Sequence, residues 1–142
     1  IKFEYTKIKK YKKMIKFVYQ NSPRGTGDAV LKCKKLIRSK HFLMLLPDDL
    51  IMKNNCSRSM IKIHNFYNSS VIASKIVKRS DVSRWGIFDI KKINKRNFFI
   101  TNVVEKPSIK SAPSKYAVIG RYILPKKIFK ILQEILKFPS VY

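Results

Sequence analysis

Two acidic residues, Asp48 and Asp49, follow a short apolar run, residues 42–46, that ends at Pro47. A run this short and wholly apolar predicts a buried strand of a parallel sheet rather than a helix, which would need more length. A carboxylate after such a strand can bind Mg²⁺, which proteins typically hold through one or two carboxylates plus substrate phosphates and water. The structural alternative is that Asp49 only caps a turn or the next helix.

A glycine-bearing loop, residues 20–27, is the second candidate site. Its Gly25 and Gly27 could let backbone amides approach a phosphate group or a base. Because a Gly-x-Gly spacing is common, an ordinary turn remains the preferred interpretation of the loop taken alone. Both loops follow expected strands, and open α/β sheets bind ligands at the carboxyl ends of their strands.

The cysteines and histidines do not indicate a metal site. Cys33 and Cys56 form no Cys-x-x-Cys pair, and His41 and His64 do not complete a zinc spacing. Two reduced thiols are typical of a cytosolic protein, so we expect a cytoplasmic location. No Ser/His/Asp or Cys/His arrangement indicates a catalytic nucleophile.

Hydrophobic periodicity and turn residues predict the elements that must position these loops. We expect strands over residues 14–19, 42–46, 70–77, 86–93, 97–105 and 116–124, and helices over residues 28–37, 56–66 and 125–137. Pro125 suits the first turn of the last helix. The alternation of strand, loop and helix predicts an α/β fold with a parallel sheet.

The composition sets the class of protein. The chain has 142 residues, with 32 Lys and Arg against 8 Asp and Glu, so its formal net charge is +24. A hydrophobic content of 45% can bury a core, which argues against a disordered basic tail. The length fits one domain rather than two. No apolar run is longer than residues 42–46, so we expect no membrane-spanning helix, and no secretory signal is visible.

The net positive charge raises the question of a nucleic-acid partner, because Lys and Arg release counterions from phosphates. However, Lys outnumbers Arg 25 to 7, although Arg makes the bidentate contacts to phosphate and guanine. The charge is spread along the chain, and no RNA-binding or helix-turn-helix motif accompanies it. A solvated basic surface is therefore the preferred interpretation, and nucleic acid is disfavoured as a partner.

Six blocks of sequence, taken in order, are similar to one enzyme family. They read QNSPRGTGDAV (20–30), LLPDDLI (45–51), RWGIFDI (84–90), VVEKP (103–107), APSKYAVIGRYIL (112–124) and PKKIFKIL (125–132). Their order and spacing resemble bacterial UTP–glucose-1-phosphate uridylyltransferases, which are nucleotide-sugar pyrophosphorylases. The resemblance covers residues 14–136. It implies a three-layer, Rossmann-like nucleotide-diphospho-sugar transferase fold with a mixed, mainly parallel sheet.

The resemblance also implies a reaction and a set of site residues. The family forms UDP-glucose and pyrophosphate from UTP and glucose 1-phosphate, with Mg²⁺ as cofactor. Residue by residue, Gln20 would contact the uracil, Gly25 would lie against the nucleotide, and Asp48 would bind Mg²⁺. Its neighbour Asp49 would be less constrained.

The same resemblance assigns the sugar and phosphate contacts. Gly86 would meet the sugar through its backbone, Glu105 would accept hydrogen bonds from glucose hydroxyls, and Gly120 would lie on a strand beneath the sugar. Lys106 would pair with a phosphate and is the expected catalytic residue. The attacking phosphate oxygen is already anionic, so no general base is needed. Taken singly, Glu105 and Lys106 could instead be an exposed pair at a strand end.

This chain departs from the family pattern in several places. Nothing in it corresponds to the N-terminal glycine-rich phosphate loop or to the C-terminal part of the family. We therefore expect a single, partial nucleotidyltransferase domain over residues 1–142, with a basic, poorly defined stretch at 1–13. We expect this partial domain to be inactive on its own. Arg24 stands where the family loop is apolar, and it could block the base or pair with a phosphate.

Alternatives to this function remain open. Within the class, a thymidylyl- or other nucleotidyltransferase is one, although the LPDD and VVEKP blocks favour the uridylyl branch. Outside it, the chain could be a non-enzymatic remnant that binds a nucleotide sugar or a protein partner, or a basic nucleic-acid-binding protein. We expect no membrane partner, and a full-length protein could form a homo-oligomer.

Overall fold

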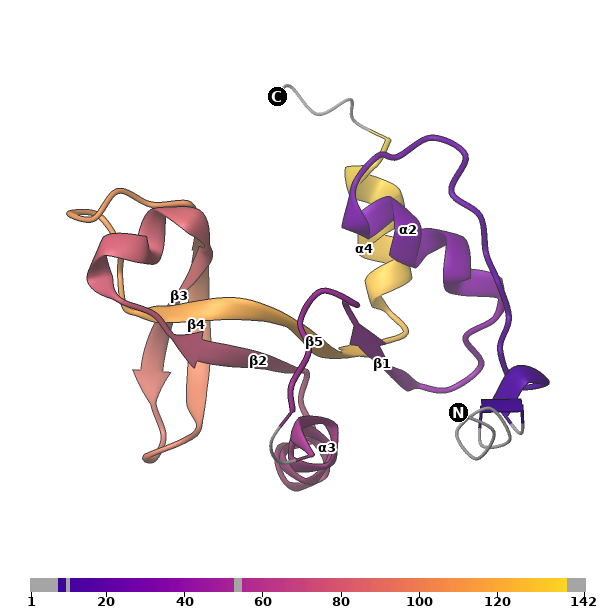
Figure 1. Ribbon diagram of the computed structural model, residues 1–142, viewed down its shortest axis with the longest axis horizontal. Helices are drawn as coiled ribbons and strands as arrows, with labels where there is room; N and C mark the ends of the chain where they lie inside the picture. The colour runs from indigo at the N-terminus through magenta and orange to yellow at the C-terminus, as the bar shows by residue number, and fades with distance from the viewer. Residues whose placement is uncertain (1–7, 10, 53–54, 138–142) are drawn as a thin grey trace. The chain divides into compact units, whose positions relative to one another are not determined.

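The computed structural model describes residues 8–9, 11–52 and 55–137. The chain forms two compact units, residues 1–39 with 126–142 and residues 40–125, and each is described by itself. Figure 1 shows the elements of both units. The single domain predicted over residues 1–142 stays a prediction, and part of the predicted basic stretch, residues 1–7 and 10, lies outside the described residues.

The first unit is built on two helices, α2 (Thr26–Lys32) and α4 (Ile128–Ile135), which lie side by side (Figure 1). A short 3₁₀ turn, η1 (Cys33–Lys35), continues α2. Phe129 of α4 is buried, and Gly27 of α2 lets the helices approach, because a Cβ there would lie 3.1 Å from Leu132 Cδ2. This packing holds the start of α2, and with it the glycine-bearing loop.

The second unit is a five-stranded sheet with one helix. Its strands are β1 (His41–Leu45), β2 (Val71–Ile76), β3 (Gly86–Lys92), β4 (Phe98–Glu105) and β5 (Tyr116–Pro125). Helix α3 (Cys56–Tyr67) separates β1 from β2, and the 3₁₀ turn η2 (Arg79–Arg84) separates β2 from β3. A buried cluster of Val82, Ile87, Ala112 and Ala117 ties η2 to the sheet.

Strand β5 organises this sheet. β1 pairs antiparallel with one edge of β5, from His41 opposite Pro125 to Leu45 opposite Arg121, and β2 pairs antiparallel with the other edge. β3 contacts β5 where Ile87 lies opposite Ala117, and it forms a hairpin with β4. The end of β1 and the start of β3 are thereby brought to β5, and β4 is held next to β3.

The predicted α/β class is confirmed, but the expectation of a mainly parallel sheet is corrected. β1 and β2 run in the same direction, as a strand–helix–strand unit predicts, yet β5 lies between them and pairs antiparallel with both. Among the described strands every recorded pairing is antiparallel. An apolar run reports burial on both faces of a strand and not the direction of its neighbour, so it could not reveal this insertion.

The strand predicted over residues 14–19 is wrong. Residues 15–20 are in neither helical nor strand conformation, and no described strand pairs with them. Phe17 and Tyr19 are 80% and 81% exposed. Alternation of side chains does not make a strand without a hydrogen-bonded neighbour.

The other predicted strands and helices are present, with small shifts at their ends. Pro125 is the last residue of β5 rather than the first turn of α4. In the described part of the chain, no helix has the length and apolar content that crossing a membrane requires.

Candidate functional site

Gly86 and Glu105 face each other at the end of the β3–β4 hairpin. They are directly paired in the strand register. A Cβ on Gly86 would lie 3.0 Å from the Oε2 atom of Glu105 and 3.3 Å from Val118 Cγ2. Because glycine leaves this space open, the carboxylate lies close to the Gly86 backbone. The structure therefore brings together two of the three residues predicted at the sugar, the third being Gly120.

Lys106 follows Glu105 in an uncommon backbone conformation. Its φ is 45°, in the left-handed region, which costs a non-glycine residue about 1–2 kcal/mol. Its N–H donates to the carbonyl of Trp85 at 3.0 Å, which fixes the strand end. The Lys106 side chain is exposed, and within the described residues it forms no ion pair. Its ammonium is therefore available to an anionic ligand.

Gly120 on β5 binds the loop that follows β1 through its backbone. Its N–H donates to Asp49 Oδ2 at 2.5 Å, and its carbonyl accepts from the N–H of Leu46 at 2.8 Å. A Cβ on Gly120 would lie 2.5 Å from Leu46 Cβ and 2.8 Å from Asp49 Oδ2, so only glycine fits. This geometry gives Gly120 a structural role, and its predicted position beneath a sugar stays a prediction.

Arg121 fastens the same loop from the next position of β5. Its guanidinium donates to the carbonyls of Leu46 and Gly120 at 2.8 Å each, and also to the carbonyl of Asp49. The loop is thus bound to β5 through side chain and backbone, and Asp48, which is exposed, is held within it. The predicted metal ligand therefore lies in a fixed loop, and within the described residues its own carboxylate forms no ion pair or hydrogen bond.

The pKa of Tyr122, the next residue of β5, responds to groups of both this loop and the hairpin end. Burial raises the pKa of the Tyr122 hydroxyl, and the nearby carboxylates of Asp49 and Glu105 raise that pKa further. Both carboxylates are therefore close enough to Tyr122 to act on its charge. The charge of Tyr122 therefore depends on one carboxylate of the β1 loop and one of the hairpin end.

In the other unit, Gln20 and Gly25, the two residues predicted to meet the nucleotide, are in contact. Gln20 Nε2 donates to the carbonyl of Gly25 at 3.3 Å and to Asp28 Oδ2 at 2.7 Å. Gly25 has a φ of 86°, which glycine adopts without the penalty that other residues meet. The left-handed conformation of Gly25 therefore belongs to the turn in which the Gly25 carbonyl accepts the Gln20 hydrogen bond.

Asp28, in the first turn of α2, is the buried residue that contacts this loop, with 2% of its surface exposed. Arg24 Nη2 donates to its Oδ1 at 3.2 Å, and Lys32 Nζ lies 3.9 Å from the same atom. The hydrogen bond from Gln20 lowers the pKa of Asp28, and the charges of Lys32 and Arg24 also lower it, against the opposing effect of burial. Arg24 thus folds back onto Asp28.

Several of these residues were not anticipated from the sequence. Asp28 was expected only as the start of a helix, and Asp49 was expected to be less constrained than Asp48. Arg121 was expected only to lie beside Gly120 on the strand beneath the sugar. In the second unit, the contacting residues are about 70 positions apart in the chain, as Asp49 and Gly120 are. The signal that could have found Arg121 is its place directly after the glycine of the IGRY block.

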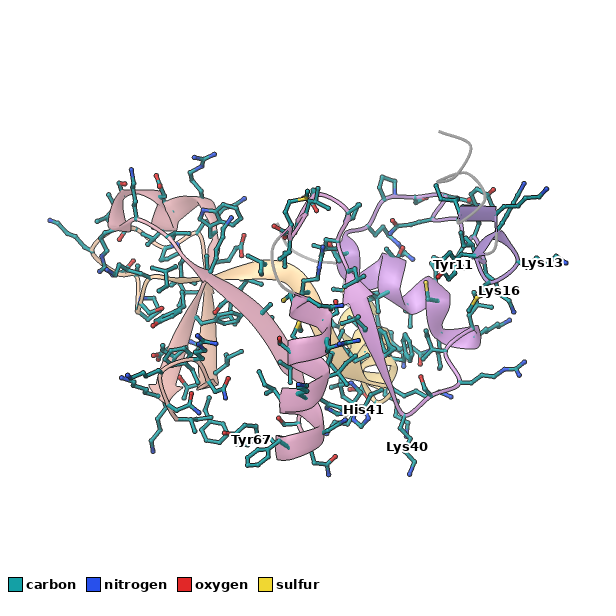
Figure 2. All side chains as sticks on the ribbon, turned by 60° about the horizontal axis from the view of Figure 1, so that its bottom comes forward. Tyr11, Lys13, Lys16, Lys40, His41 and Tyr67 are labelled. Carbon is teal, nitrogen blue, oxygen red and sulfur yellow. The ribbon has the colours of Figure 1, made fainter. Side chains whose placement is uncertain are left out.

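The remaining metal-ligand types do not assemble a centre. In the ranges that the structure describes, no group of three or more His, Cys, Asp and Glu is placed to hold a metal ion. Cys33 and Cys56 are free thiols, as predicted. His41, labelled with Tyr67 of α3 in Figure 2, packs against His64 with ring centroids 4.4 Å apart and ring planes tilted by 60°. His64 is thus a packed histidine.

Comparison with known proteins gives the family. A family model described as nucleotidyl transferase matches residues 1–140. The chain is 34% identical over 122 residues to a UTP–glucose-1-phosphate uridylyltransferase of Bacillus subtilis, covering 85% of this chain and 41% of that protein. It is 36% identical over 124 residues to a UTP–glucose-1-phosphate uridylyltransferase of Streptococcus pyogenes, covering 83% of this chain and 41% of that protein.

A solved structure of a UDP-glucose pyrophosphorylase complexed with UDP-glucose is similar with a TM-score of 0.77 and 36% identity, over 84% of this chain and 46% of that one. The chain thus spans about two fifths of the length of the relatives that it matches, 41% of each. The resemblance expected from the six sequence blocks is confirmed. The chain belongs to the nucleotidyl transferase family.

Proposed function

We propose that the chain supplies the base-, metal- and sugar-contacting part of an enzyme that forms UDP-glucose and pyrophosphate from UTP and glucose 1-phosphate. The observation that carries the proposal is the Glu105 carboxylate lying against the glycine backbone of Gly86, its register partner, with the exposed Lys106 ammonium on the next residue. The similar relatives named for this reaction support it. So does the similar structure that contains UDP-glucose.

Glu105 would bind the sugar. A carboxylate accepts hydrogen bonds from two neighbouring hydroxyls and forms stronger bonds with them than a neutral acceptor. The lack of a side chain at Gly86, opposite Glu105 in the register, leaves its backbone open to the same ligand. The Glu105 carboxylate and the Gly86 backbone would therefore recognise the arrangement of hydroxyl groups on glucose.

Lys106 would act on the phosphates. In the reaction, a phosphate oxygen of glucose 1-phosphate attacks the α-phosphorus of UTP, the bond to the bridging oxygen breaks, and pyrophosphate leaves with the electron pair. The protein must mainly align the reactants and neutralise charge. The ammonium of Lys106 is exposed, and Lys106 directly follows Glu105. It would place a positive charge next to the carboxylate that binds the sugar.

Asp48 would be the Mg²⁺ ligand. It is an exposed carboxylate in a loop that Asp49 and Arg121 fix to β5. This fits Mg²⁺, which takes one or two protein carboxylates and completes its shell with phosphate oxygens and water. When bound, the ion would neutralise phosphate charge. Gln20 and Gly25 would contact the base and the nucleotide.

The test is a two-dimensional amide NMR titration of this chain with UDP-glucose and Mg²⁺. We expect dispersed signals that move on titration, and a Glu105→Gln variant that binds about 10-fold more weakly because it loses a charged acceptor. Asp89→Asn is the matched control, since Asp89 is exposed on β3 and makes the same change of charge. A folded chain whose signals ignore UDP-glucose would contradict the proposal.

We further propose that these 142 residues do not catalyse the reaction alone, because the family's phosphate-loop pattern has no match in them. Incubation with UTP, glucose 1-phosphate and Mg²⁺ should give no UDP-glucose. Formation of UDP-glucose by the isolated chain would overturn this expectation. Activity regained on adding the unmatched N-terminal segment of a relative would favour a split enzyme over a non-enzymatic remnant.

A further inference from the structure

We propose that Asp28 determines the base specificity of the nucleotide site by fixing the orientation of the Gln20 side-chain amide. The proposal rests on the proposed function, in which Gln20 contacts the base. It assigns a specificity role to a residue that does not itself touch the ligand.

The orientation follows from the partners of Gln20. Asp28 Oδ2 lies 2.7 Å from Nε2 of Gln20, and the carbonyl oxygen of Gly25 lies 3.3 Å from the same atom. An ionised carboxylate and a backbone carbonyl are both acceptors only. If the amide flipped, its Oε1 atom would face two acceptors and both hydrogen bonds would be lost. Two independent contacts therefore require the NH₂ group on the Asp28 side.

Asp28 is well placed to hold this orientation. Its side chain is 2% exposed, so water does not replace the Gln20 contact easily. The other carboxylate oxygen accepts from Arg24 and lies near Lys32, so the carboxylate is held from both sides. These two cations also favour its ionised, acceptor-only state.

The consequence is that Gln20 offers a ligand only an acceptor. In the described part of the chain, the Oε1 atom of Gln20 accepts no hydrogen bond. Uracil and thymine carry a donor, the N3–H group, on the edge where cytosine carries an acceptor nitrogen. The Gln20 carbonyl therefore suits uracil or thymine, and with cytosine it would leave two acceptors facing each other. An unpaired acceptor of this kind weakens binding about 10- to 100-fold.

The experiment compares UDP-glucose with CDP-glucose, which differ only in the base. Binding to the whole chain is measured by calorimetry or NMR titration for the unaltered protein, Asp28→Asn and the control Asp89→Asn. We expect the unaltered protein and the control to bind UDP-glucose about 10- to 100-fold more tightly than CDP-glucose. In Asp28→Asn this preference should shrink to a few-fold, because the asparagine offers both a donor and an acceptor and lets the Gln20 amide flip.

A second readout needs no ligand and no variant at position 28. The chain has two glutamines, Gln20 and Gln133. The Gln20 side-chain NH₂ signals, assigned by their loss in Gln20→Ala, should exchange with water much more slowly than those of Gln133, whose amide is exposed. This readout decides the matter even where Asp28→Asn fails to fold.

Each outcome gives a decision. If Asp28→Asn keeps the full preference for UDP-glucose, or if the Gln20 NH₂ exchanges as fast as that of Gln133, the specificity role of Asp28 is overturned while the proposed function stands. If the Gln20 NH₂ is protected but neither nucleotide sugar binds, the proposed function fails, and base specificity fails with it. Protection together with a reduced preference in Asp28→Asn supports both.

Discussion

The carboxylate of Asp49 accepts a hydrogen bond from the backbone N–H of Gly120 at 2.5 Å, and so joins the loop after β1 to the central strand β5. The two residues are 71 positions apart in the chain. Arg121, next to Gly120, binds the carbonyl groups of the same loop. The exposed carboxylate of Asp48 therefore lies next to a residue, Asp49, that is fixed to β5. A side chain that is to hold a ligand in a defined place needs such a fixed backbone.

Replacing Gly120 with alanine should destabilise the protein. The added Cβ would lie 2.5 Å from Leu46 Cβ, so the loop would have to move away from β5. We expect the free energy of unfolding, measured by urea denaturation, to fall by about 1–3 kcal/mol. Gly86→Ala is the comparison, because its closest neighbour is the end of the flexible Glu105 side chain at 3.0 Å. Equal losses in the two variants would contradict this account of the Gly120 contact.

Arg121→Lys should also weaken the loop. One guanidinium reaches the carbonyls of Leu46, Gly120 and Asp49 together, whereas an ammonium is a compact point charge that does not reproduce the fork. We expect a loss of about 1–2 kcal/mol in the free energy of unfolding. The amide NMR signals of Asp48 and Asp49 should shift as well. Arg84→Lys, at an exposed position, is the matched control and should change neither quantity.

Two variants at Lys106 separate the effect of its backbone conformation on stability from the effect of its ammonium on ligand binding. Its φ of 45° favours glycine, so Lys106→Gly should be more stable than Lys106→Ala by about 1 kcal/mol in thermal or urea unfolding. Both variants lose the ammonium, and both should bind UDP-glucose more weakly to a similar extent. If Lys106→Gly bound as tightly as the unaltered chain, Lys106 would have no role in phosphate binding.

Much of the local structure was predictable, because apolar runs and turn residues act over short distances. The runs at residues 42–46 and 116–124 gave β1 and β5 nearly at their observed bounds. The direction of pairing was not predictable in the same way. The antiparallel insertion of β5 between β1 and β2 depends on contacts between distant segments, about which a local pattern carries no information.

The candidate site shows the same division. Gln20, Gly25, Asp48, Glu105 and Lys106 were assigned through sequence blocks, since each stands inside a short recognisable motif. The residues that hold them act across the chain or through burial. Arg121 binds a loop 75 positions earlier, and the burial of Asp28 is set by packing that the sequence does not display.

The stability of the protein in acid should report the Asp28 contacts. The pKa of Asp28 is lowered in the folded protein, chiefly by the hydrogen bond from Gln20 and then by Lys32 and Arg24. A group whose pKa is depressed on folding stabilises the protein above its unfolded pKa, which is about 3.9 for aspartate, and that contribution disappears as the pH falls through the folded value. The difference in unfolding free energy between the unaltered chain and Asp28→Asn should therefore be constant from neutral pH to about pH 5 and shrink below about pH 4. Urea denaturation across this range measures it, with Asp89→Asn as the variant of equal charge. A difference that stays constant down to the lowest pH would show that Asp28 does not titrate with a depressed pKa, and that the Gln20 amide is not held by an ionised partner.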